Sequence, residues 1–207
     1  MVKNRYPGLF IAFEGLDGSG ASVQSLLLNG VLKKEGYRVH LTKEPTNYLI
    51  GGLIKGSLTN EWKTSPECLQ LLFTADRAHH LKKEIIPRLE SGRIVITDRY
   101  VFSSIAYGSL EIDDLNWIEE LNRRFILPDL IFLIKVRPKI CALRLKESHY
   151  ELELFSEEQK LAKVWKTYEK LQRSYKNMYL IDGERDEIEI IKEISTITHQ
   201  TLETIKK

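Results

Sequence analysis

A glycine-rich segment near the N-terminus constrains the fold more than any other part of the chain. It reads FEGLDGSGASVQ (13–24), with Gly15 and Gly20 five positions apart and Ser22 two positions later. An almost wholly apolar run (8–15) leads into it, which is typical of a strand buried on both faces. A glycine turn between such a strand and a helix directs backbone N–H groups and a helix N-terminus at one point. The segment therefore predicts a phosphate-binding loop.

The loop departs from the usual pattern G-x-x-x-x-G-K-[ST] at one position, where Ala21 stands in place of the lysine. The backbone cradle and the hydroxyl of Ser22, a ligand for Mg²⁺, do not depend on that lysine. The lysine adds a positive charge near the transferring phosphoryl group. Two interpretations stay open: a loop that still transfers phosphate with another cation, and a loop that only binds nucleotide.

The rest of the chain alternates between strand-like and helix-like segments. Strands are expected at 8–15, 37–45, 93–100, 128–136 and 177–183. Helices are expected at 21–35, 65–92 (one helix or two), 113–125, 138–147, 156–177 and the C-terminal end. This alternation predicts one α/β domain over residues 1–207, with three α/β/α layers around a five-stranded parallel sheet. Ligands bind such sheets at the carboxyl ends of the strands.

Composition excludes several classes of function. The 31 basic and 29 acidic residues give a formal charge of +2, so neither nucleic acid nor a membrane surface is an expected partner. No apolar run reaches about 18 residues, and the N-terminus does not resemble a secretory signal. Cys68 and Cys141 are too few for a disulfide framework and are expected to be packed thiols. A cytoplasmic location is the expectation.

Five short motifs carry a resemblance that covers nearly the whole chain. They are FEGLDGSGAS (13–22), KEPT (43–46), LLFTADRAHH (71–80), DRYVFSSIAYG (98–108) and LPDLIFLIKV (127–136). In this order they resemble the thymidylate kinase family, whose P-loop enzymes transfer the γ-phosphoryl group of ATP to dTMP. The resemblance implies the P-loop NTPase fold, Mg²⁺ as cofactor, ATP and dTMP as substrates, and a homodimer packed through helices. Trp117 and Phe125 are candidates for that interface or for the core.

The resemblance also implies roles for individual residues. Catalytic roles fall on Asp98, Arg99, Lys135 and Arg144, and Mg²⁺ would be held by Ser22 and Asp98. The ATP phosphates would contact Gly15, Gly18, Ser19, Gly20, Ala21, Ser22 and Lys146. The dTMP site would comprise Asp17, Lys43, Glu44, Pro45, Lys55, Phe73, Arg77, Arg99, Ser104 and Tyr107. Within it, Phe73 would stack on thymine, Arg77 on the same helix face would donate to a base carbonyl, and Tyr107 would lie under the deoxyribose.

Two further departures accompany Ala21. Gly108 replaces a glutamine that in relatives helps to read the base edge, and Lys135 replaces an aspartate at a strand end. Lys135 could supply the missing charge, or it could simply extend into solvent. A lid is expected at about 144–160, where Arg144 and Lys146 would close over the phosphates or be ordinary exposed residues. A kinase for another pyrimidine monophosphate and a catalytically weak nucleotide-binding homologue remain the alternative functions.

Overall fold

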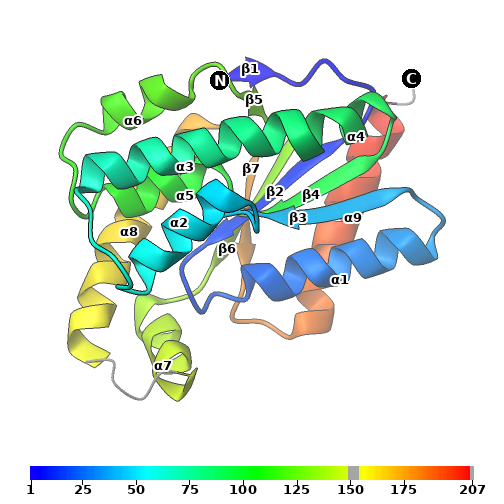
Figure 1. The fold of residues 1–207 in the computed structure, drawn as a ribbon. Coiled ribbons are helices and arrows are strands. Elements are labelled where there is room, and N and C mark those ends of the chain that lie inside the picture. Colours follow the sequence, from blue (N-terminus) through cyan, green and yellow to red (C-terminus); the bar gives the residue numbers. More distant parts are fainter. Residues whose placement is uncertain (149–153, 206–207) are drawn as a thin grey trace.

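The computed structural model describes residues 1–148 and 154–205 (Figure 1). The strands are β1 (Val2–Lys3), β2 (Phe10–Gly15), β3 (Val39–Lys43), β4 (Ile94–Asp98), β5 (Ile126–Leu127), β6 (Leu130–Lys135) and β7 (Met178–Asp182). The helices are α1 (Ala21–Lys34), α2 (Leu49–Leu58), α3 (Pro66–His80), η1 (Leu81–Ile85), α4 (Ile86–Glu90), α5 (Val101–Gly108), α6 (Leu115–Asn122), α7 (Pro138–Ser148), α8 (Leu154–Ser174) and α9 (Glu187–Ile205). No helix of the described residues is long and apolar enough to cross a membrane.

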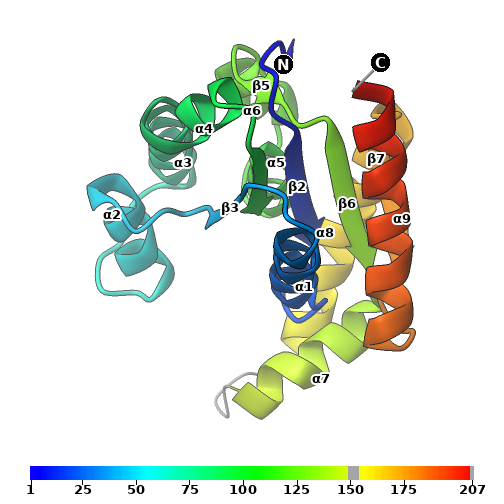
Figure 2. The same cartoon turned by 90° about the vertical axis from the view of Figure 1, so that its right-hand side faces the viewer.

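Five of the strands form one parallel sheet in the order β3-β4-β2-β6-β7. Helices α1 and α9 contact each other on one face, and α5 and α8 contact each other on the other face (Figures 1 and 2). The short strands β1 and β5 form a separate parallel pair. The expected three-layer architecture with a five-stranded parallel sheet is therefore confirmed.

The middle of the sheet is buried because its strands carry almost no polar side chains. All six residues of β2 and the first five of β6 are buried. Register places Phe13 of β2 beside Asp98 of β4, and Gly15 beside Ile134 of β6. The loop that follows β2 therefore lies between the carboxyl ends of β4 and β6, as the strand order of a doubly wound sheet requires.

The long helical region expected at 65–92 consists of α3, η1 and α4 in direct succession. Ser65 caps its start, accepting a hydrogen bond from the backbone N–H of Cys68 at 3.2 Å, and Pro66 occupies the first turn. The segment Leu81–Ile85 is π-helical. The continuous run thus agrees with the expectation, with one wide turn inside it.

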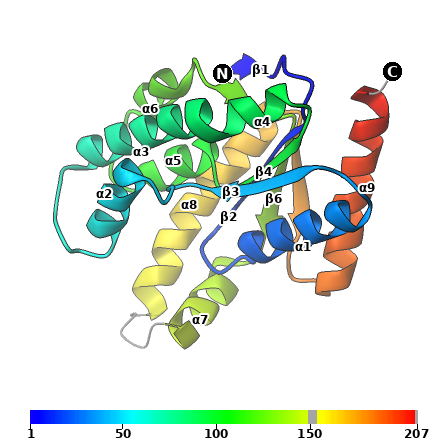
Figure 3. The ribbon, with the colours of Figure 1, turned by 45° about the vertical axis from the view of Figure 1, so that its right-hand side comes forward.

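Helices α2 and α5 were not expected from the sequence. In α2, a Cβ atom at Gly51 would lie 2.1 Å from the backbone oxygen of Thr46, so the glycine is needed for close packing. The expected lid at 144–160 spans the end of α7 and the beginning of α8, and its residues 149–153 lie outside the described part of the chain. Figure 3 shows α7 near the carboxyl end of β2, where the chain continues into α1.

Candidate active site

The phosphate-loop residues bring the end of β2 around to the first turn of α1. Gly18 has a φ of 80°, and a Cβ atom there would lie 2.8 Å from the backbone oxygen of Cys141 in α7. Only glycine accommodates both the left-handed backbone and the close approach of α7. Burial raises the pKa of the Cys141 thiol to about 12, and the thiol is free. Cys141 is therefore a packed, unreactive thiol beneath the loop, as expected.

The oxygen atoms of Ser22 and Asp98 meet at the junction of loop and sheet. The Ser22 hydroxyl donates to Oδ2 of Asp98 at 2.6 Å. Oδ1 of Asp98 is buried and has no hydrogen-bond partner among the described residues. A carboxylate and a hydroxyl are ligands that suit Mg²⁺. No cluster of three or more His, Cys, Asp or Glu side chains is placed to hold a metal in the described ranges, so substrate phosphates and water would supply the other ligands.

Three basic side chains were predicted to act near the loop, and they differ in position. Arg144 of α7 donates from Nη1 to the backbone oxygen of Gly18 at 2.9 Å. Lys135 is the last residue of β6 and is exposed beside Asp182 of β7. Lys146 is also exposed, two residues beyond Arg144. The described structure therefore brings Arg144 onto the phosphate loop.

Arg99 connects the phosphate loop to the rest of the site. Its Nη2 donates to Oδ1 of Asp17 at 2.5 Å, and its Nη1 donates to Ser103 at 2.9 Å and to the Gly15 carbonyl at 3.2 Å. Burial opposes the charge of Arg99, but Asp17, Tyr107, Tyr168 and Glu14 together outweigh it, so the pKa of Arg99 is raised. The backbone φ of 72° is unusual for a residue with a side chain and is typical of functional sites.

Beneath Arg99 lies a buried carboxyl group that the sequence analysis did not single out. Glu14 is completely buried and accepts hydrogen bonds from Ser103 at 2.5 Å, Tyr168 at 2.9 Å and the backbone N–H of Tyr100 at 2.9 Å. Burial raises the pKa of Glu14 to about 7, despite these donors and the charge of Arg99. Glu14 thus links β2, α5 and α8 under the reacting end of the site.

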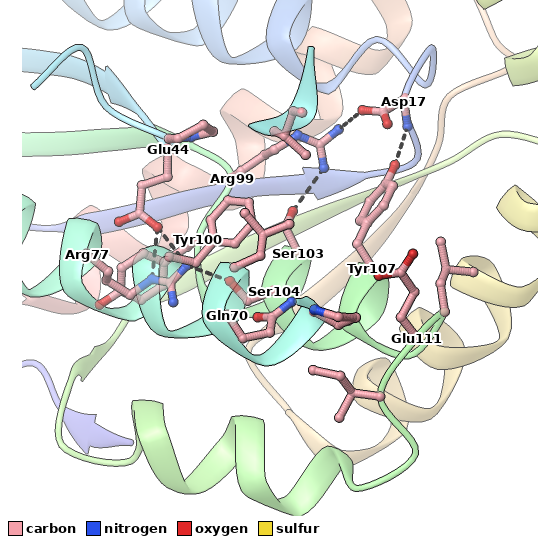
Figure 4. A pocket seen from close by; sticks show the side chains of 18 residues that line it. Asp17, Glu44, Gln70, Arg77, Arg99, Tyr100, Ser103, Ser104, Tyr107 and Glu111 are labelled. Carbon is pink, nitrogen blue, oxygen red and sulfur yellow. Dashed lines mark hydrogen bonds and ion pairs between the residues drawn. The ribbon is translucent and has the colours of Figure 1, made fainter. Parts of the chain in front are cut away.

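A cavity of about 310 Å³ opens beside Arg99 between α3 and α5 (Figure 4). Its lining includes most of the residues predicted for the acceptor site: Asp17, Glu44, Pro45, Phe73, Arg77, Arg99, Ser104 and Tyr107. The hydroxyl of Tyr107 accepts a hydrogen bond from the backbone N–H of Asp17 at 2.8 Å. The ring of the same tyrosine lies 5.3 Å from the guanidinium carbon of Arg99. The cavity is thereby joined to the phosphate loop.

Arg77 is held in one orientation at the back of this cavity. It is 1% exposed, and its guanidinium contacts Glu44 at 2.8 Å, Asn122 at 2.6 Å and Ser104 at 2.9 Å. Its carbon also lies 5.2 Å from the ring centre of Tyr100. A guanidinium carries five N–H groups. Three of them make these hydrogen bonds, and Nη2 also forms an ion pair with Glu44 at 2.8 Å, so the second N–H of Nη1 has no partner among the described residues.

The two lysines predicted for the acceptor site lie outside this cavity. Lys43 ends β3 and lines a neighbouring groove of about 620 Å³ that also contains Ser22 and Asp98. Lys55 in α2 donates to Asn47 at 2.6 Å. Both lysines are therefore near the sheet edge, but neither lines the acceptor cavity.

Some residues of the cavity escaped the sequence analysis. Gln70 lies on α3 three residues before Phe73 and seven before Arg77, so helical spacing could have placed it on the same face. Asn122 of α6 orients Arg77 across 45 residues of sequence, and no local pattern indicates that contact. Glu14 stood inside the loop motif, where burial in the central strand is the signal for a perturbed carboxyl group.

The phosphate loop lies directly beside the acceptor cavity, at the carboxyl ends of a parallel sheet. This arrangement is typical of enzymes that transfer a phosphoryl group between two bound nucleotides. The chain is a P-loop nucleoside monophosphate kinase, a phosphotransferase. Comparison with known proteins narrows the class: residues 13–194 match the model of the thymidylate kinase family. The chain belongs to the thymidylate kinase family, as its motifs predicted.

Relatives in several organisms agree with this assignment. A probable thymidylate kinase of Thermococcus kodakarensis is 38% identical over 186 residues, covering 86% of this chain and 91% of the relative. A probable thymidylate kinase of Pyrococcus horikoshii is 39% identical over 183 residues, covering 85% and 88% respectively. A thymidylate kinase of Thermosipho melanesiensis is 35% identical over 199 residues, covering 94% of this chain and the full length of the relative.

Proposed function

We propose that the protein transfers the γ-phosphoryl group of ATP to dTMP, giving ADP and dTDP. The observation that carries this proposal is the position of Arg99, which contacts the phosphate loop at Gly15 and also lines the acceptor cavity. A guanidinium at that junction can bind the acceptor phosphate and the transferred group together. Transfer is then in line, and catalysis rests on positioning and charge stabilisation.

The acceptor nucleoside lies in the cavity between α3 and α5. Phe73 supplies a ring for stacking, and the remaining N–H of Arg77 donates to a base carbonyl. Tyr107 packs against the deoxyribose, where its ring leaves little room for a 2′-hydroxyl group. The 3′-hydroxyl donates to the carboxylate of Asp17, which also accepts a hydrogen bond from Arg99.

The donor phosphates bind in the loop, and Ser22 and Asp98 would hold Mg²⁺ beside them. The buried, unpartnered Oδ1 of Asp98 supports this assignment, because a buried carboxylate oxygen without a partner is costly. When bound, the cation neutralises charge on the phosphate oxygens. Backbone N–H groups of the loop and of the first turn of α1 would donate to the phosphate oxygens.

We assign the charge of the absent loop lysine to Arg144 ahead of Lys135. The guanidinium of Arg144 already contacts the loop, whereas Lys135 extends from the strand end into solvent. Arg144 belongs to the segment 144–160, which we propose acts as a lid with Lys146 and excludes water from the phosphates. Arg144 can exchange its bond to the Gly18 carbonyl for one to a phosphate oxygen, since it is exposed.

The proposal extends to organisation. Residues 1–207 form a single kinase domain that acts in the cytoplasm as a homodimer packed through its helices. Trp117 and Phe125 are only partly buried in the single chain, which leaves part of each side chain for such an interface. Neither nucleic acid nor a membrane is a partner.

The test of the proposed function is a panel of phosphoryl acceptors with Mg²⁺ and ATP. The purified protein is assayed with dTMP, dUMP, dCMP and ribothymidine monophosphate, and the nucleoside diphosphate formed is measured by chromatography. The proposal predicts the highest kcat/KM with dTMP. A higher value with dCMP would overturn the assignment of the substrate, and the Arg99→Met variant controls for contaminating kinases.

A further inference from the structure

The side chain of Gln70 is buried in the acceptor cavity beside the residues assigned to the base. It lies on α3, one turn before Phe73 and two turns before Arg77, and it is 6% exposed. Figure 4 shows it among the side chains that line the cavity. The proposed function gives roles to Phe73 and Arg77 and leaves this glutamine without one.

The amide of Gln70 has an unused acceptor. Its Oε1 is buried and accepts no hydrogen bond within the described part of the chain. A buried acceptor without a hydrogen-bond partner destabilises the folded protein, because it has lost its bonds to water and gained none in return. A ligand in the cavity that supplies a hydrogen-bond donor would satisfy this oxygen.

Gly108 makes the position of this amide possible. A Cβ atom at Gly108 would lie 3.0 Å from Nε2 of Gln70 and 2.5 Å from Cδ1 of Ile118. A side chain at position 108 would therefore have to displace the amide of Gln70 and the end of the Ile118 side chain. Gly108 on α5 therefore leaves the space that the glutamine on α3 occupies.

We propose that Gln70 reads the hydrogen-bonding edge of the acceptor base and so determines specificity in place of a side chain at Gly108. This inference rests on the proposed function, in which the cavity binds a pyrimidine nucleotide. Thymine presents N3–H between two carbonyl oxygens. Oε1 of Gln70 accepts from N3–H, and Nε2 donates to the adjacent carbonyl.

Arg77 and Gln70 together select the 4-keto pyrimidines. The guanidinium of Arg77 is a permanent donor and is fixed by Glu44, Asn122 and Ser104, so it requires an acceptor at position 4 of the base. Cytosine presents an amino group there and an unprotonated N3. With cytosine, the guanidinium of Arg77 would therefore face a donor at position 4. Oε1 of Gln70 would face an acceptor at N3.

The test compares Gln70→Met with the wild-type protein on two acceptors, dTMP and its 3-deaza analogue, which has C–H in place of N3–H. Methionine has similar length and no hydrogen-bonding group, so it removes the contact without opening a hole. Wild-type protein should show a kcat/KM for the analogue roughly 10- to 100-fold below that for dTMP, and Gln70→Met should show nearly equal values. Most of the loss with dTMP should lie in KM.

Two further variants separate reading of the base from a structural role. Gln70→Ala removes the amide without adding volume and should show the same loss of discrimination. Leu71→Met, on the exposed side of α3, should behave as wild type. The melting temperature of Gln70→Met should equal or exceed that of the wild type, because an unpartnered buried polar group is removed.

Each outcome bears on one claim. If the wild type phosphorylates dTMP and Gln70→Met retains the discrimination between dTMP and the analogue, the role of Gln70 is wrong and the proposed function stands. If the wild type phosphorylates no pyrimidine nucleotide, the proposed function fails and the role of Gln70 fails with it.

Discussion

Replacing the buried Glu14 by glutamine should remove a pH dependence of stability. Burial raises the pKa of this carboxyl group from 4.5 to about 7 in the folded protein. Below pH 4.5 both states are protonated, and the group has no differential effect. Between pH 4.5 and 7 the unfolded chain loses the proton while the folded protein keeps it, so the free energy of unfolding falls as pH rises.

The size of this effect follows from the two pKa values. Their difference of about 2.5 corresponds to roughly 3 kcal/mol at 1.36 kcal/mol per pH unit, which is an upper bound. Above pH 7 the loss is complete and the slope ends. Glutamine keeps the shape, and the hydroxyls of Ser103 and Tyr168 can turn to accept from its NH₂ group.

Urea unfolding at pH 5, 6, 7 and 8 measures the effect. Relative to Glu14→Gln, the wild type should lose up to about 3 kcal/mol over this range. Glu111→Gln, at an exposed carboxyl that lines the acceptor cavity, controls for the removal of one acidic group. Parallel pH profiles of wild type and Glu14→Gln would contradict a raised pKa, because Glu14 would then be ionised to the same extent in the folded and unfolded states.

Three other predictions concern charged groups of the site. Arg144→Met should lower kcat by ~10²–10³ in a coupled ADP assay if it replaces the loop lysine, while Lys135→Met should change kcat less than about threefold. Asp98→Asn should raise the Mg²⁺ concentration for half-maximal rate by roughly 10- to 100-fold; an unchanged Mg²⁺ requirement would exclude Asp98 as a ligand. Arg77→Met should lower the free energy of unfolding by about 3–5 kcal/mol, because Glu44 stays buried without the guanidinium and keeps only its contact with His80 at 3.1 Å. A loss below about 1 kcal/mol in urea titration would show that the pair is not needed for stability.

The sheet could be predicted because its strands carry the information locally. The apolar run at 8–15 and the Ser65-Pro66 start of α3 both behave in the structure as their patterns indicate. Helix α2 could not be predicted, because its glycines weaken a helical pattern and its packing depends on a close approach of Gly51 to Thr46. That contact exists only in the folded chain.

The residues of the site also fall into those predicted from local motifs and those that depend on contacts distant in sequence. Motif residues such as Asp17 and Arg99 were predicted to share a site and are in contact. The partners that fix Arg77 come from elements 33 and 45 residues away, beyond the reach of spacing arguments. The proposed role of Gln70 depends on the absence of a side chain at Gly108. The sequence shows the glycine but not that Gln70 packs against it, so this role could not be predicted.

We propose that the phosphate loop of this protein transfers phosphate to dTMP without its lysine. The measurement to make is ADP release by the purified protein with Mg²⁺ and ATP, with and without dTMP. We expect ADP release that depends on dTMP and is matched by an equal amount of dTDP. No dTMP-dependent ADP release, in a protein that binds both nucleotides, would contradict it and would show that the loop with Ala21 only binds.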